Sequence, residues 1–355
     1  MKNDALPFEK VRAIQVRKGK PLSQLIAEMS DTGFQGRRLA EVCDIFEEMI
    51  GEKDLTILMG YAASLSVAGQ WSIISWMLER RYIDVLAATG ANLTEDIVEG
   101  MGYSYYKGTH MVDDEFLCQK GLNRYYDIYG SEKEYMKMIE LIGEFILTLD
   151  ENHKYSSREF LYLLGLWLGQ RGVKCIVVSA AEKKIPVFCP GIADSPVGDA
   201  ALFARSKGFN LCIDAIKDYV EFMGLAEKVK DTGVFYIGGG VPKDFVQLFA
   251  VSADLLYKDR KIPNRKNPVT REGTDETYHP HKYAIQITSD SPQWGGLSGC
   301  TFEEATSWGK ETISGVGRTA QCFCDATIAL PLLAHVIAER VEEARQGVCF
   351  SELFG

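Results

Sequence analysis

Short apolar runs alternate along the chain with longer segments whose apolar residues recur every three or four positions. The short runs end in Gly, Ser, Thr, Asn or Asp, which is typical of buried strands that lead into loops. They predict strands over residues 55–60, 83–89, 174–179, 186–189, 233–238, 283–288 and 320–326. The longer segments have the spacing of amphipathic helices, and they predict helices over residues 66–81, 156–172, 212–229 and 243–256.

The alternation of strands and helices predicts an α/β fold with a doubly wound, mostly parallel, Rossmann-like sheet and helices on both faces. We expect residues 51–355 to form one domain of this kind. Residues 1–50 look helical and polar, and they predict a helical N-terminal extension that suits packing across another subunit. The sequence contains no internal repeat and no low-complexity segment.

Composition narrows the class of protein. At 355 residues and 46% hydrophobic, the chain can bury a large core. It has no run of about 18 apolar residues, and its first residues lack the apolar centre of a signal peptide, so we expect a cytoplasmic protein without membrane contact. The net charge of -10 is the opposite of the basic surface that nucleic-acid binding needs, so we expect no nucleic-acid partner. A cationic ligand agrees with this charge.

Potential metal ligands are too few for a site. Nine cysteines, an odd number, lie mostly in apolar runs and suit reduced thiols. The pair Cys322 and Cys324 supplies too few ligands for zinc, and its segment has the pattern of a strand with alternating faces. His279 and His281 follow a basic, proline-containing segment over 257–271 that predicts an irregular surface loop. Because no third ligand is evident, we expect solvated histidines and no metal.

Small and acidic residues cluster just after the predicted strands, in the segments MGYAASLSVAG, AATGANLTED, PGIADSPVGDA, IGGGVPKD, TSDSPQWGGLSG and FCDAT. At the strand ends of a parallel sheet, small residues let backbone N–H groups approach phosphates, and an aspartate can accept ribose hydroxyls. Several such ends together predict a dinucleotide site. The G-x-G-x-x-G fingerprint is absent, and the triple glycine alone is equally consistent with a tight turn.

Lys310 follows a tryptophan and a glycine in the segment EEATSWGKETISG. Desolvation against an indole ring favours the neutral amine, which is the form that attacks carbonyls and imines to make Schiff bases. The alternative is an ordinary lysine near a helix end, with its charged group in water.

The segments EEATSWGK and CDATIALPLLAHVIAE resemble the C-terminal active-site region of the deoxyhypusine synthase family. MGYAASLSVAG, IDVLAATGANLTEDI, PGIADSPVGDA and FYIGGGVPK occur in the family's order and spacing, so the resemblance extends from about Val11 to about Leu333. It implies a single NAD-binding catalytic domain over 51–355. It also implies that NAD takes a hydride from spermidine, that diaminopropane leaves, and that the lysine of the Trp-Gly-Lys motif holds the aminobutyl group as an imine. The implied acceptor is a lysine of a translation factor, or a small amine in homospermidine-forming relatives.

The resemblance assigns roles to individual residues. Lys310 matches the nucleophile and Trp308 lines the aminobutyl pocket. The implied cofactor contacts are Ser64, Ser66, Thr89, Gly90, Asp194, Gly239, Gly240, Asp325 and Ala326. The implied acidic positions around the amine are Glu95, Asp199 and Glu304, with Ser298, Asp244 and Trp294 as further substrate-binding candidates. Three of the acids have another explanation, because Asp194 and Asp199 could cap turns and Glu95 could cap a helix start. The family also implies a homotetramer with sites at dimer interfaces.

Several departures from the family's pattern concern the substrate. Asp244 stands where the family has a histidine, and Trp294 and Leu297 stand where it has aspartates. The segment from about Lys258 to His281 looks inserted, and two extra residues separate Lys310 from Asp325. The acceptor therefore stays open between a protein lysine and a small amine. An alternative function is a non-catalytic NAD or polyamine sensor; a sirtuin-like deacylase is disfavoured because the paired C-x-x-C zinc module is missing.

Overall fold

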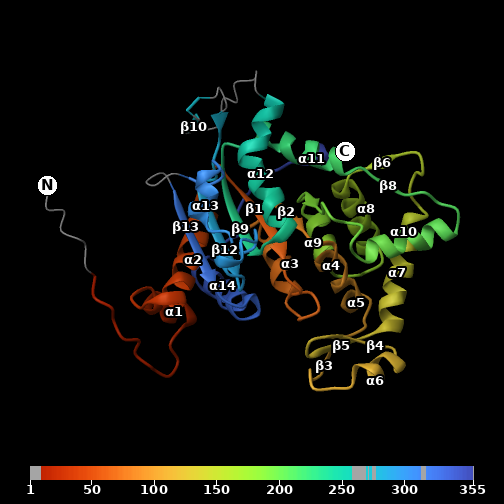
Figure 1. The fold of residues 1–355 in the computed structure, drawn as a ribbon, viewed down its shortest axis with the longest axis horizontal. Coiled ribbons are helices and arrows are strands. Elements are labelled where there is room, and N and C mark those ends of the chain that lie inside the picture. The colour runs from red at the N-terminus through yellow and green to blue at the C-terminus, as the bar shows by residue number, and fades with distance from the viewer. Residues whose placement is uncertain (1–8, 258–268, 271, 274–276, 313–316, 355) are drawn as a thin grey trace.

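The structure is a computed structural model that describes residues 9–354 except 258–268, 271, 274–276 and 313–316. Its centre is a parallel sheet with the strand order β13-β12-β9-β1-β2-β7 (Figure 1). The strands are β1 (Leu55–Ala62), β2 (Val85–Ala88), β7 (Val187–Phe188), β9 (Asp231–Gly238), β12 (Tyr283–Thr288) and β13 (Arg318–Phe323). The predicted α/β fold with a parallel sheet is confirmed.

Helices and minor strands surround this sheet. The helices are α1 (Leu22–Ser30), α2 (Phe34–Gly51), α3 (Trp71–Glu79), α4 (Gly90–Thr94), α5 (Asp96–Gly100), α6 (Asp114–Gln119), α7 (Glu132–Ile146), α8 (Ser157–Gly169), α9 (Ile176–Glu182), α10 (Pro196–Ser206), α11 (Ala215–Gly224), α12 (Gly240–Tyr257), α13 (Phe302–Ser307) and α14 (Ala326–Arg340). Short 3-10 helices are η1 (Leu225–Glu227), η2 (Pro292–Trp294) and η3 (Ser351–Phe354). The minor strands are β3 (Tyr106–Lys107), β4 (Leu122–Tyr125) and β5 (Ile128–Ser131), which form one sheet, and the pairs β6 (Lys154–Tyr155) with β8 (Cys212–Ile213) and β10 (Val269–Thr270) with β11 (Thr277–Tyr278).

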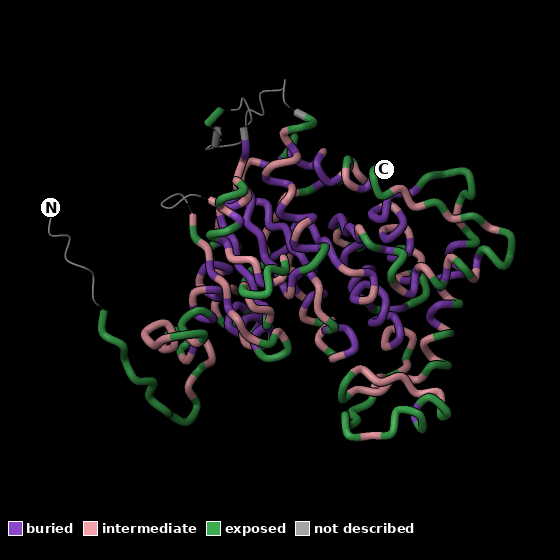
Figure 2. The backbone as a smooth tube through the Cα atoms, in the orientation of Figure 1, coloured by how far each residue is buried: buried purple, intermediate pink, exposed green. Residues whose placement is uncertain are grey.

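Both faces of the central sheet carry buried apolar side chains, because helices cover both. On one face, Leu58 and Val234 belong to a core shared with α11, α12 and α13. On the other, the neighbouring residues Ile57 and Phe235 belong to a larger core shared with α2, α3, α8, α9 and α14. Alternate residues of a strand point to opposite faces, so each buried strand supplies both cores. Figure 2 shows the buried backbone concentrated in this sheet and the helices beside it.

Helix α2 packs on the sheet of its own chain. The ring of Phe46 on α2 lies 5.0 Å from the ring of Phe235 on β9, measured between centroids. Arg340 at the end of α14 donates to Asp44 Oδ1 at 2.8 Å and to Glu47 Oε2 at 3.0 Å. The residues of α2 therefore form part of the main core, while the domain boundary at residue 50 stays a prediction.

The prediction of a strand over residues 174–179 is wrong, because helix α9 begins at Ile176. The helix residues from Ile176 to Ala181 are all buried, next to α8 and α3. A short apolar run that is buried on all sides has no periodicity that separates a strand from a helix. Several boundaries also differ. The helix predicted from residue 66 begins at Trp71, and the last strand ends at Phe323. The helix predicted over 212–229 spans only Ala215–Gly224, because residues 212–213 form β8 and a short 3-10 helix follows Gly224.

The expectation of solvated histidines is also wrong. His279 Nδ1 lies 2.7 Å from Asp254 Oδ2, and the buried His281 has its Nδ1 2.7 Å from Thr232 Oγ1. Most of the basic segment before them lies outside the described residues. Within those residues, no three His, Cys, Asp or Glu side chains are grouped so that they could hold a metal ion. In the same part of the chain, no helix has the length and hydropathy needed to cross a bilayer.

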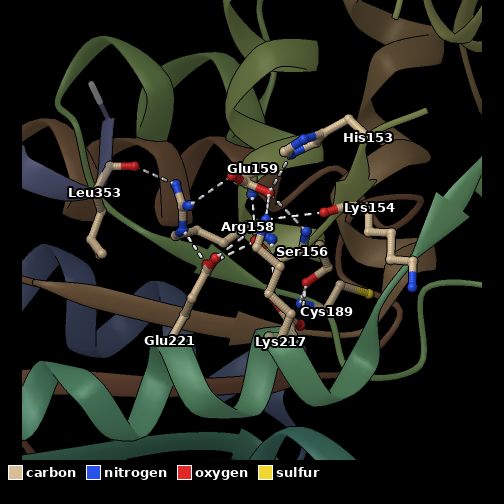
Figure 3. A network of polar contacts seen from close by, with 11 residues as sticks. His153, Lys154, Ser156, Arg158, Glu159, Cys189, Lys217, Glu221 and Leu353 are labelled. Atoms are coloured by element: carbon tan, nitrogen blue, oxygen red, sulfur yellow. Dashed lines mark hydrogen bonds and ion pairs between the residues drawn. The ribbon is translucent and has the colours of Figure 1, made fainter. Parts of the chain in front are cut away.

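A polar network supports the segment that leads from β7 into α10 (Figure 3). Arg158, at the start of α8, donates to Glu221 Oε2 on α11 and to the backbone oxygen of Leu353, both at 2.7 Å. The adjacent Ser157 accepts a hydrogen bond from the backbone N–H of Cys189 at 2.7 Å. Helices α8 and α11 and the C-terminal segment thus fix the loop that follows β7.

Candidate active site

The candidate cofactor residues gather along one edge of the sheet. All strands of the central sheet run parallel, so their carboxyl ends lie at the same edge, where ligands of such folds bind. The loops that leave this edge carry Ser64 and Ser66 after β1, Thr89 and Gly90 after β2, Asp194 after β7, Gly239 and Gly240 after β9, and Asp325 and Ala326 after β13.

The turn after β2 is held by its own polar side chains. Ser66 Oγ donates to the backbone oxygen of Asn92 at 2.9 Å, and Asn92 Nδ2 donates to Thr89 Oγ1 at 2.9 Å. A Cβ atom at Gly90 would overlap the side chain of Ser195 at the start of α10, so the glycine lets these two turns pack together. The result is a fixed turn at the edge of the sheet, in which Ser66 is fully buried and Asn92 is 3% exposed.

Asp325 lies at the start of α14, and its side chain also stabilises that helix. Its Oδ1 accepts hydrogen bonds from the backbone N–H of Thr327 at 2.7 Å and from the Thr327 hydroxyl at 2.6 Å, so Asp325 caps the helix. Gln70 Nε2 donates to the backbone oxygen of Thr327 at 2.8 Å, which ties the loop after β1 to the same helix end. Ser64, in that loop, is exposed.

Asp194 is exposed beside a hollow of about 490 Å³. The hollow is lined mostly by apolar residues of the loop after β7 and by Leu211 and Ile213. Its polar lining includes Asp218, a carboxyl whose pKa is raised to about 6 by burial. Asp194 therefore stands at the rim of an apolar recess rather than in a turn that needs its side chain as a cap.

Glu95 and Asp199 face a cluster of tyrosines near α4 and α10. Glu95 is only 7% exposed, and burial raises its pKa to about 7. Burial raises the pKa of Tyr135 to about 12, and the charges of Glu95 and Asp199 contribute in the same direction, so both acids lie near this ring. The Tyr105 hydroxyl donates to the backbone oxygen of Glu95 at 3.0 Å. Acidic and phenolic groups in this arrangement suit the binding of an ammonium group.

Both backbone polar groups of Lys310 are hydrogen-bonded. Its N–H donates to the backbone oxygen of Ala305 at 3.1 Å, and its oxygen accepts from the N–H of His281 at 2.9 Å. Gly309 has a φ of 76°, a conformation that favours glycine, and a Cβ atom there would approach the ring of Tyr278 to 3.1 Å. The turn that precedes Lys310 therefore requires the glycine of the Trp-Gly-Lys segment.

The Lys310 side chain is 12% exposed, so it is not an ordinary surface lysine with its charged group in water. Its Nζ lies 3.1 Å from Asp244 Oδ1 on α12 and 5.7 Å from the centre of the Trp308 ring. Asp244 and Trp308 are themselves accessible, at 42% and 61% exposure. A partly shielded amine thus lies next to an indole and a carboxylate that solvent can reach.

The segment before α13 crosses the triple-glycine turn. Gly240 donates its N–H to Ser298 Oγ at 3.0 Å, and a Cβ atom at Gly239 would overlap the backbone of Ser298. Gly240 has a φ of 59° and open space where a Cβ would stand. Glu304, in the first turn of α13, and Trp294 are exposed. Ser298, Glu304, Trp308 and Lys310 therefore lie close to the turn after β9.

The candidate residues belong to different helices that surround the sheet. Lys310 and Glu304 follow or belong to α13, which packs beside β13, whereas Glu95 and Asp199 belong with α4 and α10 beyond β2 and β7 (Figure 1). The Nζ of Lys310 nevertheless lies 3.1 Å from Asp244 on α12, which contacts β1 and β2. The ring of the adjacent Phe245 lies 5.9 Å from the ring of Phe188 on β7, so the Lys310 amine reaches the helix that covers the middle of the sheet.

Three residues near Lys310 were missed by sequence analysis. Lys243, Gln286 and Gln321 form a polar network beneath the 298–302 segment. The available signal was a glutamine at the fourth position of each of two strands, YAIQIT and RTAQCF, together with a lysine inside a helix pattern.

Comparisons with known proteins show the family to which the chain is similar. Residues 24–337 match the family model described as deoxyhypusine synthase. The chain is 44% identical over 331 residues to the protein named "Probable deoxyhypusine synthase 2" of Methanosarcina acetivorans, covering 93% of this chain and 90% of the relative. It is 34% identical over 335 residues to "Probable deoxyhypusine synthase 1" of Archaeoglobus fulgidus, covering 94% of this chain and 100% of the relative.

Among more distant relatives, the "Deoxyhypusine synthase-like protein" of Elusimicrobium minutum is 31% identical over 348 residues, covering 96% of this chain and 87% of the relative. The crystal structure of a candidate deoxyhypusine synthase from Entamoeba histolytica superimposes with a TM-score of 0.61 at 14% identity, covering 94% of this chain and 98% of that one. This structural likeness shows a shared fold.

Proposed function

Because the chain belongs to the deoxyhypusine synthase family of transferases, we propose that it is an NAD-dependent aminoalkyl transferase that moves an aminobutyl group from a polyamine through an imine on Lys310. The observation that carries the proposal is the placement of the Lys310 amine, which is largely shielded from solvent beside Trp308 and 3.1 Å from Asp244. The acceptor is either a small amine, as in homospermidine formation, or a protein lysine such as that of a translation factor.

Lys310 acts as the nucleophile. Its free amine adds to the imine carbon of the oxidised donor, the carbon–nitrogen bond to the leaving diamine breaks, and the aminobutyl group stays on Nζ as an imine. An acceptor amine then displaces Lys310 in the same way. Asp244 Oδ1 is within hydrogen-bond reach of Nζ, so it holds the amine in place and takes up its proton as the new bond forms.

The edge of the sheet offers polar groups that fit NAD. Among the described residues, the buried atoms Asn92 Oδ1, on α4, and Gln70 Oε1, just before α3, have no hydrogen-bond partner, and both residues lie at this edge. The residues that would hold the cofactor are Ser64, Ser66, Thr89, Gly90, Asp194, Gly239, Gly240, Asp325 and Ala326. When bound, NAD supplies the oxidation of the donor amine and the reduction of the product imine.

The polyamine would bind between the acidic groups. Glu95, Asp199, Asp244 and Glu304 supply carboxyl groups for its ammonium ions, while Trp308 and Trp294 supply apolar surface for its methylene chain. Since the indoles of Trp294 and Trp308 are 78% and 61% exposed, we propose that the site closes between subunits. A homotetramer with sites at dimer interfaces would cover these indoles.

Two measurements on the purified protein test this proposal. Ultraviolet absorbance should report NADH formation when spermidine or another polyamine is added with NAD. Borohydride should then trap an aminobutyl mass on the peptide that carries Lys310. Ligand-induced thermal stabilisation without either signal would contradict the proposal and support a non-catalytic sensor instead.

A further inference from the structure

Three polar side chains meet beneath the segment that leads into α13 and Lys310. Lys243 lies in the first turn of α12, Gln286 on β12 and Gln321 on β13. Gln286 and Gln321 are directly paired positions in the parallel register of their strands, so their side chains lie next to each other. Lys243 and Gln286 are fully buried, at 0% exposure. We refer to these three residues as the lysine–glutamine clamp.

Lys243 and Gln321 donate hydrogen bonds to the same two oxygen atoms. Lys243 Nζ donates to Gln286 Oε1 at 2.9 Å and to the backbone oxygen of Cys300 at 2.8 Å. Gln321 Nε2 donates to the same two oxygens, at 2.7 Å and 2.9 Å. Each acceptor oxygen therefore receives two donors, which uses its full capacity. A satisfied network of this kind defines one arrangement of its members.

The clamp also joins two segments of backbone. Gln286 Nε2 donates at 2.8 Å to the oxygen of Gly238, at the end of β9, and at 2.8 Å to the oxygen of Ser298. Gln321 Oε1 accepts the N–H of Phe302, the first residue of α13, at 3.1 Å. The turn that carries the candidate cofactor glycines and the segment that begins the nucleophile's helix are thus held by the same side chains.

The chemistry of Lys243 argues against a role in stability alone. Burial lowers the pKa of Lys243 to about 8, which reports the cost of placing its ammonium group away from water. A methionine would fill a similar volume without that cost. Lys243 donates to Gln286 and to the backbone oxygen of Cys300, so the buried amine is best explained by the positions in which it holds these two groups.

We propose that the lysine–glutamine clamp positions Glu304, Trp308 and Lys310 against the cofactor turn after β9, an inference that rests on the proposed transferase function. Its three members are positioning residues, because their polar groups are directed at backbone and at one another. A shift of the 298–302 segment would carry α13 with it, and displacements of about 1 Å can cost roughly a hundredfold in rate when reacting groups must meet in one geometry.

The test compares Gln321→Met with the wild-type protein. The variant removes the two donations to the clamp and the acceptor for Phe302, while the cofactor turn keeps its bond from Gln286. We expect single-turnover formation of the borohydride-trapped adduct to slow by about tenfold or more, with NAD affinity unchanged within about twofold. We also expect faster amide hydrogen exchange, read by mass spectrometry, over residues 298–309.

Thr56→Val is the matched control, because Thr56 is a buried polar residue of the same sheet, on β1. It should leave the exchange of residues 298–309 and the trapping rate as in the wild type. A folded Gln321→Met protein with wild-type exchange and a wild-type trapping rate would overturn the clamp.

Two further arms keep the test decisive. If Gln321→Met does not fold, Gln321→Glu takes its place, because it keeps the size of the side chain and an acceptor for Phe302 while it loses the donors; the same two outcomes then apply. If the wild-type protein forms no adduct, the proposed function is wrong. The comparison of hydrogen exchange between Gln321→Met and the wild type would still test the clamp.

Discussion

The Nζ of Lys310 lies 3.1 Å from Asp244 Oδ1, across the gap between the turn after α13 and the first turns of α12. The two residues are 66 positions apart in the sequence. The Lys310 side chain is largely shielded, while Asp244 keeps 42% of its exposure, so the pair has one closed and one open side. This arrangement gives the amine a fixed partner that solvent can reach, and it leads to the first prediction.

Lys310→Arg should abolish transfer. A guanidinium group cannot be deprotonated in a protein, so it can hold Asp244 but cannot form an imine. Borohydride trapping followed by peptide mass spectrometry should show no adduct in the variant. Lys282→Arg is the control, because Lys282 pairs with Glu52 in a comparable ion pair just before β12 and should react like the wild type. Transfer that survives in Lys310→Arg would mean that the covalent route is wrong.

Asp325→Ala should weaken NAD binding and also destabilise the protein. The carboxylate caps α14, so its loss should cost about 1 kcal/mol of the free energy of unfolding. If it also accepts a buried hydrogen bond from the cofactor, calorimetry should show a further loss of about 1.5 to 3 kcal/mol in binding. Asp194→Ala should lower affinity by a similar amount. Unchanged affinity in both variants would remove the two aspartates from the cofactor site.

Two control variants separate the cap from the cofactor contact. Asp325→Asn keeps a good capping residue while it removes the charge, so it should recover stability more than NAD affinity. Asp113→Ala removes an equivalent cap on α6, where Asp113 Oδ1 accepts from Glu115 N–H at 3.0 Å. That variant should change stability alone.

Glu95 should make stability depend on pH near neutrality. Burial raises its pKa from 4.5 to about 7, so between those values the folded state holds a proton that the unfolded state has released. The contribution of Glu95 to the free energy of unfolding is therefore complete below about pH 4.5 and is lost as pH rises through 7. Glu95→Gln should remove this loss and leave the variant more stable than the wild type at pH 8, by roughly 2 to 4 kcal/mol at most.

Denaturant unfolding at pH 5 and pH 8 provides the measurement for Glu95. Asp96→Asn is the informative comparison, because burial raises the pKa of Asp96 to about 7 as well. Its Oδ2 accepts the N–H of Ile176 at 2.6 Å, so its replacement should also disturb α9. A pH dependence of the Glu95→Gln protein equal to that of the wild type would contradict the assignment.

Most of the central sheet could be predicted from the sequence, because its strands lie in apolar runs that end in small residues. The strand predicted over 174–179 was wrong, since burial of residues 176–181 of α9 removes the periodicity that identifies a helix. The burial of His281 also could not be foreseen, because its partner Thr232 is 49 positions away. Motif residues such as Lys310 were visible through a resemblance, whereas its pairing with Asp244 depends on how α12 and α13 meet in space.

The lysine–glutamine clamp also could not be predicted from the sequence. Gln286 and Gln321 become neighbours only when β12 and β13 pair in register, and Cys300 O meets them only when the 298–302 segment crosses the sheet edge. Local pattern predicts that a residue is on a strand, but the strand order decides which polar groups meet. Sequence analysis therefore found the residues proposed to touch substrate and cofactor and missed those that support them.

The final prediction concerns which amine the protein prefers. The resemblance places a histidine at Asp244 and aspartates at Trp294 and Leu297 in the family's pattern, so this chain has more negative charge beside Lys310 and less along the exposed loop before α13. A pocket for spermidine needs carboxylates near both ends, and the loss of one buried charged contact costs on the order of 1.5 to 3 kcal/mol, or roughly tenfold to a hundredfold in affinity. We therefore expect a shorter amine, or one with an apolar segment against Trp294, to be preferred over spermidine. We also expect Asp244→His to shift the preference back towards spermidine.

This amine preference is measured by product mass spectrometry with putrescine, spermidine, homospermidine and agmatine as donors and acceptors. Asp254→Asn, ten residues further along the same helix, where the carboxylate pairs with His279, is the control and should keep the wild-type order of amines. Efficient transfer from spermidine onto a hypusine-type translation factor by the wild-type protein, with spermidine the best donor, would contradict this prediction and leave the family's ordinary reaction as the function.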